Sequence, residues 1–121
     1  MHEVSISQTI IDSLENEFNE EELDQIRKVH LRVGILSCVE PVILKHVFSM
    51  MVADGLLQGA ELEIELVDVL AFCENCNKEF KVEQYIFICA DCGRSSSKIL
   101  EGKELQIHKI IFEKPVYEKT T

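Results

Sequence analysis

Two Cys-x-x-Cys pairs constrain the fold of this chain more than any other feature. Cys73 and Cys76 form the first pair, Cys89 and Cys92 form the second, and twelve residues separate the pairs. Each pair can present two thiolates from one tight turn, and four thiolates at this spacing can surround one ion tetrahedrally. The pattern therefore predicts an inserted four-cysteine, zinc-ribbon-like module.

The ion in this module is expected to be structural. A closed four-sulfur site leaves no coordination position for a substrate. Rubredoxin-type iron uses the same geometry, so the spacing leaves iron open, with two disulfides as a further alternative. The chain has five cysteines, and an odd number suits a reducing compartment better than a disulfide framework. Asn77 and Gly93 are typical of turns that require a positive φ after each pair.

Length and charge exclude several classes of protein. A chain of 121 residues has room for one small domain that carries a metal-stapled insert. The net charge of −10 argues against a nucleic-acid partner, since phosphate binding depends on many Lys and Arg contacts. The sequence shows neither a membrane span nor a secretory signal, so we expect a cytoplasmic protein. No set of nucleophile, base and orienting group is apparent, so we expect no enzymatic activity.

Hydrophobic periodicity indicates an α+β domain around the insert. The expected elements are a helix starting near residue 5, a strand over 29–36, a helix over 39–54, a strand over 60–67 and a strand over 103–112. Capping-box patterns at Ser5–Gln8 and Ser37–Glu40 set the helix starts. One face of the sheet is polar, which places both helices on the other face. The domains are thus expected to be residues 1–70 with 101–121, and the zinc-binding insert 71–100.

The periodicity also predicts which side chains are buried. These are Ile6, Ile10, Ile11, Leu14 and Phe18 on the first helix, Ile43, Leu44, Val47, Phe48, Met50 and Met51 on the second, and Leu62, Ile64 and Leu66 on the strand that follows. The acidic residues after Phe18 are interpreted as the solvated end of the first helix and a turn.

The N-terminus is a candidate for a second metal site. The Met1 amine, the His2 amide and the His2 ring can close fused chelate rings around one ion, and the Glu3 amide can complete a square of nitrogens. Ni²⁺ or Cu²⁺ tolerates such a plane, whereas Zn²⁺ gains nothing from it. The first amides of a helix have no intrahelical acceptor and are available as ligands. The alternative is that His2 is an exposed residue of a frayed terminus. The pattern of the first three residues, taken by itself, favours this alternative.

The remaining candidate side chains have simpler interpretations. His30, His46 and His108 are interpreted as packed or solvated residues. Cys38 lies off the metal spacing and is expected to be a small buried apolar residue. Glu40 is expected to cap the second helix, with a supporting role near the N-terminal metal site as its second candidate function.

Several motifs in a fixed order resemble one known family. They are Met1-His2-Glu3, Leu36-Ser37-Cys38-Val39-Glu40-Pro41, Gly59-Ala60-Glu61-Leu62-Glu63-Ile64, the two Cys-x-x-Cys pairs and Gly102-Lys103-Glu104-Leu105. Together they are similar to the HypA/HybF family of nickel metallochaperones over residues 1 to about 112. The sequence departs from the family at Ile35, where relatives often carry an acidic residue.

The resemblance implies a function and a ligand set. It implies that Met1, His2 and Glu3 bind Ni²⁺ as transient cargo and that the four cysteines hold structural Zn²⁺. It implies delivery of nickel to the large subunit of [NiFe]-hydrogenase together with the accessory GTPase HypB, and some relatives also serve urease maturation. The expected fold is two helices on one face of a mixed three-stranded sheet plus the zinc domain. We expect a monomer or weak homodimer without nucleic-acid or membrane partners.

One alternative function belongs to another class. Lys78, Lys81, Arg94 and Lys98 give the insert positive charge, so a zinc-ribbon adaptor that binds a protein or a nucleic acid is the competing hypothesis. The insert lacks an aromatic and basic stacking platform, which weakens the nucleic-acid version.

Overall fold

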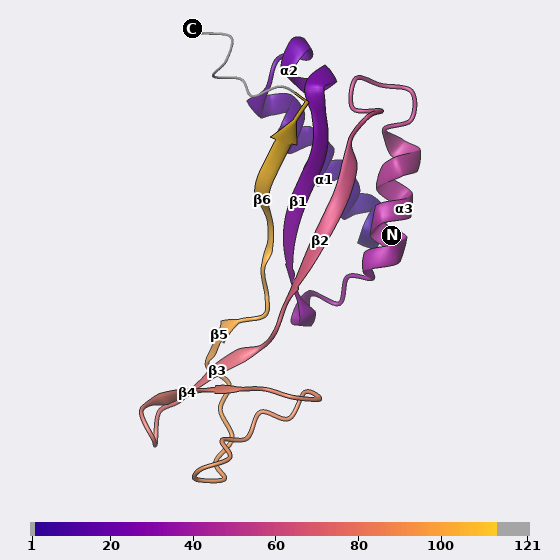
Figure 1. The fold of residues 1–121 in the computed structure, drawn as a ribbon. Helices are drawn as coiled ribbons and strands as arrows, with labels where there is room; N and C mark the ends of the chain where they lie inside the picture. The colour runs from indigo at the N-terminus through magenta and orange to yellow at the C-terminus, as the bar shows by residue number, and fades with distance from the viewer. Residues whose placement is uncertain (1, 114–121) are drawn as a thin grey trace, which may run out of the picture. The chain divides into compact units, whose positions relative to one another are not determined.

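The structure is a computed structural model, and it describes residues 2–113 (Figure 1). Its elements are α1 (His2–Glu17), α2 (Glu20–Gln25), β1 (Ile26–Gly34), a 3-10 turn (Ile35–Ser37), α3 (Pro41–Met51), β2 (Glu61–Val67), β3 (Leu70–Cys73), β4 (Lys78–Lys81), β5 (Ile99–Glu101) and β6 (Leu105–Phe112). None of the helices in this range is long and apolar enough to cross a membrane. The predicted α+β class is confirmed.

The first sheet has the strand order β2-β1-β6. Lys28 on β1 pairs with Glu63 on β2 at 3.1 Å, and His30 pairs with Glu65 at 3.3 Å. Both partners advance by two residues, which happens only when the two strands share a direction, so β2 runs parallel to β1. A parallel pair needs a long crossover, and α3 lies in that connection.

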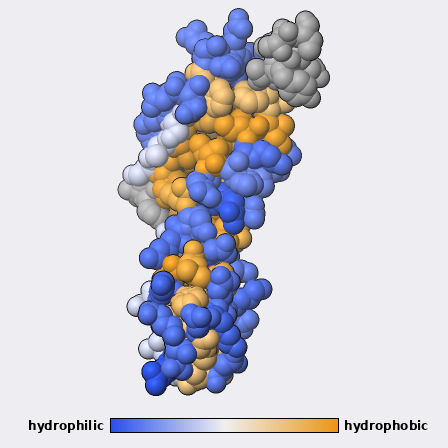
Figure 2. All heavy atoms as spheres, turned by 90° about the vertical axis from the view of Figure 1, so that its left-hand side faces the viewer, coloured by the Kyte–Doolittle hydropathy of each residue, from blue (hydrophilic) through white to orange (hydrophobic). Residues whose placement is uncertain are grey.

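The third strand of this sheet, β6, runs antiparallel to β1 and makes the sheet mixed. Gly34 near the end of β1 donates its N–H to the Glu104 carbonyl before β6, at 2.7 Å. At the other end, Glu113 donates to the carbonyl of Gln25 at 2.8 Å. Figure 2 is viewed from the side on which β6 forms the sheet edge, and it shows apolar surface in that region. The predicted mixed three-stranded sheet is confirmed.

The first helix, α1, packs the predicted apolar stripe but begins earlier than its capping pattern indicates. Ile6, Ile10, Ile11 and Leu14 are buried, as expected from their spacing. The helix begins at His2, so Ser5 lies inside the first turns and the predicted start near residue 5 is wrong. Capping patterns mark a start only where no helical residues precede them, and here the chain continues helically toward its N-terminus.

The acidic segment after Phe18, predicted to be the solvated end of the first helix and a turn, forms a helix of its own, α2. Asn19 caps it, because its side chain accepts from Glu22 N at 2.9 Å while the Glu22 carboxylate accepts from Asn19 N at 2.9 Å. Three acidic residues in the first turn stabilise the positive end of this helix dipole. The buried Leu23 attaches α2 to the core.

The second predicted helix is α3, and its buried face is narrower than expected. Glu40 is its N-cap and accepts from Val42 N at 3.2 Å, so the predicted cap Ser37 is wrong. Ser37 instead ends the 3-10 turn and donates to the Gly34 carbonyl at 2.7 Å. Leu44 and Phe48 are fully buried.

Several apolar residues that were predicted to be buried are exposed. Ile43 on α3 is 50% exposed, Met50 on the same helix is 66% exposed, and Leu66 on β2 is 52% exposed. A short helix in a small domain contacts the sheet through one narrow row of side chains, because too little core is available to cover more of its surface. The strict alternation predicted for β2 fails after Glu65, because Leu66 is exposed and the next residue, Val67, is buried instead.

The cysteine-containing segment has more regular structure than its broken periodicity indicated. β3 lies between β4 and β5 in a second three-stranded sheet, and the β3–β4 pair is antiparallel with Cys73 opposite Lys78. Val69, Ala71 and Val82 form a small core of this segment. Short strands of three or four residues contain too few positions to show an alternation in sequence.

The chain divides into two compact units. The first comprises Met1–Leu31, Val39–Glu65 and Ile107–Thr121, and the second, here called the cysteine unit, comprises Arg32–Cys38 and Leu66–Gln106. The cysteine unit therefore contains more of the chain than residues 71–100. The predicted boundaries at residues 70 and 101 stay a prediction.

Gly34 and Gly102 approach each other closely within the cysteine unit, which predicts a sensitive position. A Cβ added at Gly34 would overlap the Gly102 carbonyl and lie 2.5 Å from Lys103 N. We expect Gly34→Ala to lower the free energy of unfolding by about 3 kcal/mol, since backbone atoms cannot move aside cheaply. Chemical denaturation measures this change. Gly55→Ala is the matched control, because nothing lies within 4 Å of its added Cβ. Equal effects of the two substitutions would contradict the prediction.

Candidate metal centres

The four cysteines of the two Cys-x-x-Cys pairs converge on one point. Their sulfur atoms all lie within 4.8 Å of one another. Cys73 Sγ lies 3.5 Å from Cys92 Sγ, and Cys89 Sγ lies 4.0 Å from Cys76 Sγ. A tetrahedral ion with metal–sulfur bonds of about 2.3 Å requires sulfur atoms about 3.8 Å apart. The four thiols fit a tetrahedral thiolate-binding ion, and all of them are free rather than joined in disulfides.

Two turns with left-handed residues shape this centre. Asn77 has φ 56° and Gly93 has φ 74°, so both turns adopt the positive φ predicted from their residue types. In the first turn, Cys76 N–H points at Cys73 Sγ at 3.4 Å. In the second, Gly93 donates to the Cys89 carbonyl at 2.8 Å. Backbone N–H groups aimed at sulfur stabilise thiolate charge.

The electrostatics of the four thiols favour one thiolate when no ion is bound. Hydrogen bonding from the Arg94 backbone, and next from Cys73, lowers the pKa of Cys92 to about 6. The hydrogen bond to Cys92, together with burial, raises the pKa of Cys76 to about 12. Cys76 is thus a proton donor to a neighbouring thiolate, and an ion that binds here must displace its proton.

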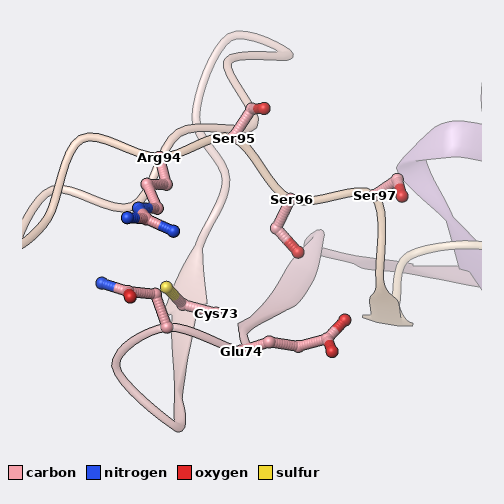
Figure 3. Close-up of a pocket in the computed structure, with 7 residues that line it drawn as sticks. Cys73, Glu74, Arg94, Ser95, Ser96 and Ser97 are labelled. Atoms are coloured by element: carbon pink, nitrogen blue, oxygen red, sulfur yellow. The ribbon is translucent and has the colours of Figure 1, made fainter.

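A cavity of about 440 Å³ opens beside the cysteines (Figure 3). It is lined by Cys73, Glu74, Asn75, Arg94, Ser95, Ser96 and Ser97. In Figure 3 the Arg94 side chain extends on the same side as the Cys73 sulfur, whereas Glu74 extends away from it. Cys73 itself is only 2% exposed, so little of its side chain reaches solvent although it lines this cavity.

The structure describes the predicted N-terminal site only in part. Met1 and the side chain of His2 lie outside the described residues. The His2 backbone begins α1, so the first amides of the chain have no acceptor four residues earlier. The Glu3 carboxylate accepts the Glu40 N–H at 3.2 Å, which brings the first turn of α1 to the N-cap of α3. Glu3 and Glu40, both named from the sequence, are therefore neighbours.

Of the remaining residues, Cys38 differs from its prediction, whereas the half-buried His30 and the exposed His108 agree with theirs. Cys38 is exposed rather than buried, and it holds a left-handed φ of 60° at the end of the 3-10 turn. His30 and His108, considered separately in the sequence, face each other edge-on with ring centroids 5.6 Å apart. Strand pairing between residues so distant in sequence leaves no local signal, so sequence reasoning missed this pair.

The sequence model described as hydrogenase/urease nickel incorporation, metallochaperone, hypA matches residues 1–112. That match covers nearly the whole chain. The chain belongs to the HypA family. The expected family resemblance is thereby confirmed, and with it the role of nickel metallochaperone in hydrogenase maturation.

Individual relatives agree with the HypA assignment. The hydrogenase maturation factor HypA of Acidithiobacillus ferrooxidans is 33% identical over 113 residues, which covers 93% of this chain and 100% of that protein. The same-named protein of Chlorobium phaeobacteroides is 35% identical over 113 residues with the same coverage. The guanidine hydrolase-activating protein A of a Synechocystis species is 36% identical over 112 residues, which covers 91% of this chain and 93% of that protein.

Two solved structures share the fold. The solution structure of the nickel metallochaperone HypA from Helicobacter pylori matches with a TM-score of 0.63 at 21% identity, over 93% of this chain and 97% of that one. A second HypA solution structure matches with a TM-score of 0.65 at 21% identity, over 93% and 96%. The α+β fold with its cysteine-containing part is thus the fold of HypA structures.

Proposed function

We propose that this HypA protein binds Ni²⁺ at its extreme N-terminus and carries it to a maturing [NiFe]-hydrogenase. The Met1 amine, the amide and ring of His2, and the Glu3 amide are the proposed ligands. The observation that carries this proposal is that α1 begins at His2. Helix geometry leaves these amides without carbonyl acceptors, so their deprotonation by a metal breaks no helical hydrogen bond.

The neighbouring carboxylates support the N-terminal site. Glu3 is tied to the backbone of Glu40, which limits the motion of the first helical turn. The Glu40 carboxylate caps α3 through Val42 N. We propose that these two carboxylates supply negative charge close to the cation, with Glu40 in a supporting rather than a ligating role. A moderate electrostatic contribution suits a carrier that must also release its cargo.

We further propose that the four cysteines hold Zn²⁺ and that this ion is structural. The sulfur geometry fits Zn²⁺, and iron in the same geometry is the alternative that metal analysis distinguishes. When bound, zinc would supply cross-links between the two turns rather than any chemistry. We propose that residues 71–100 form the zinc-binding domain and that residues 1–70 with 101–121 form the nickel-binding domain.

Membership of the HypA family supports a proposal about partners. We propose that this protein interacts with the accessory GTPase HypB and with the hydrogenase large subunit. We further propose that it acts in the cytoplasm as a monomer or weak homodimer and that it is not an enzyme. A second client is supported by one relative, because a protein 36% identical is named as an activator of a guanidine hydrolase. Nickel transfer to an apo-hydrolase is therefore a candidate function beside hydrogenase maturation.

The test of the carrier function is metal transfer. Untagged, nickel-loaded protein is mixed with the apo large subunit of a hydrogenase from the same cell, and protein-bound nickel is followed after separation. We expect nickel to move to the large subunit with the zinc retained. A zinc-ribbon adaptor would transfer no nickel. A parallel experiment with an apo-guanidine hydrolase as the acceptor tests the second client.

Acid is expected to release the zinc. The pKa of Cys92 is lowered from an ordinary 9.0 to about 6, so its thiolate is present at neutral pH. The stabilisation from this lowered pKa is complete above the ordinary value and is lost as the pH falls through about 6, where protons also compete for the other sulfur ligands. Zinc retained after gel filtration at stepwise lower pH should fall steeply below about pH 6. Unchanged retention down to about pH 5 would contradict this expectation.

A further inference from the structure

Three ligand-type side chains lie in a row across the first sheet, one from each strand. His30 on the central strand β1 lies between Glu65 on β2 and His108 on β6. His30 Nε2 is 3.3 Å from Glu65 Oε1, and the His30 and His108 rings are edge to face with centroids 5.6 Å apart. All three therefore project from the same face of the sheet. The His30 side chain is only 23% exposed, so it is partly withdrawn from water.

We propose that His30, Glu65 and His108 form a second binding site for a divalent transition-metal ion of the Ni²⁺ and Zn²⁺ class. Two imidazoles with one carboxylate are a donor set that suits nickel, copper and zinc, whereas magnesium and calcium prefer oxygen alone. The strands fix the three backbones, and the proposed site forms only when the His108 side chain rotates to turn a ring nitrogen toward His30 and Glu65. Three ligands leave open coordination positions, as in sites that exchange their ion or bind a further ligand.

The charges around this site predict its strength. Lys28 precedes His30 on the same face of β1 and is engaged by Glu63 at 3.1 Å. A positive charge beside the site opposes the binding of a metal cation, so we expect its affinity to be lower than that of a chelating N-terminus. Because it uses none of the N-terminal ligands, the proposal does not rest on the proposed function.

The experiment titrates NiCl₂ into zinc-replete, untagged protein that carries His2→Ala, which removes the proposed N-terminal ligand. Calorimetry measures affinity, and NMR follows the paramagnetic broadening of the histidine ring signals. We expect one weak nickel equivalent with selective broadening of His30 and His108. Adding His108→Ala or, separately, Glu65→Gln should weaken this equivalent at least about tenfold, as expected for loss of a ligand.

The matched control is His46→Ala in the same His2→Ala background. His46 is an exposed histidine on α3, so its removal should leave the weak equivalent unchanged. Circular-dichroism melts of each variant check the fold. If His108→Ala lowers the melting temperature, the Glu65→Gln variant still tests the loss of a ligand. The proposal is overturned if the His2→Ala protein shows no broadening of His30 and His108, or if His108→Ala and His46→Ala bind nickel equally. Neither result would affect the N-terminal site, which is tested by comparing wild type with His2→Ala.

Discussion

Replacing His2 with alanine in untagged protein is expected to abolish the tight binding of nickel. The substitution removes the imidazole and with it one of the two fused chelate rings, while the amine and amides remain. Loss of a ligand should weaken binding by at least about a hundredfold, because even outer partners of a metal site contribute ten- to a hundredfold. Calorimetric titration of NiCl₂ into zinc-replete protein measures the change. Any binding that remains should be the weak equivalent proposed for His30, Glu65 and His108.

The controls for this substitution separate the N-terminus from histidine in general. His46→Ala removes an exposed histidine from α3 and should leave the tight equivalent intact. Zinc content and the melting curve should be unchanged in both variants, because α1 makes its buried contacts from Ile6 onward. If His2→Ala protein binds nickel with the wild-type affinity, the N-terminal site does not exist and the carrier function needs another site.

Replacing Cys73 or Cys92 with alanine is expected to remove the zinc and unfold much of the cysteine unit. The apolar core of this unit centres on Val69, Ala71 and Val82, which is too little to stabilise such a segment without help. Binding energy at a structural zinc site is folding energy, and its loss should cost several kcal/mol. Metal analysis reports the zinc, and amide NMR reports which resonances of residues 66–106 lose their dispersion.

Cys38 offers a matched control for the zinc ligands. It is an exposed cysteine in the same unit but lies outside the cluster of four sulfur atoms, so Cys38→Ala should retain zinc and a native spectrum. The buried Cys73 and the half-buried Cys92 should behave alike, although Cys73 also packs within β3. If Cys73→Ala or Cys92→Ala protein keeps its zinc and its melting temperature, the four thiols are not a structural metal site.

Together these two substitutions test a division of labour between two kinds of donor. Sulfur in the cysteine unit is expected to hold one ion permanently. Nitrogen at the N-terminus is expected to hold the other ion until a partner takes it. His2→Ala should therefore weaken nickel binding without changing the zinc content, whereas Cys92→Ala should remove the zinc and disturb the surrounding fold. A variant that lost both ions together would indicate one coupled centre.

Local patterns predicted most elements of the fold but not their ends. The apolar spacing of Ile6, Ile10 and Leu14 is enough to place α1, since one face of an isolated helix must be buried. The capping signals near residues 5 and 37 were misleading, because a side chain that can cap a helix does so only where the surrounding structure ends the helix. The short helix α2 depends on the Asn19 and Glu22 capping box, which was overlooked within an acidic run.

The sequence by itself predicted that the four cysteines come together and that the turns beside them are left-handed, and it gave rise to the hypothesis of an N-terminal chelate, since each rests on residues a few positions apart. Only the tertiary structure decided that one side of α3 is exposed, that Glu3 meets Glu40, and that His30 lies between Glu65 and His108. These contacts join residues between 35 and 78 positions apart in the chain. They depend on strand order and helix docking, which arise from burial of the whole core and leave no trace in local spacing.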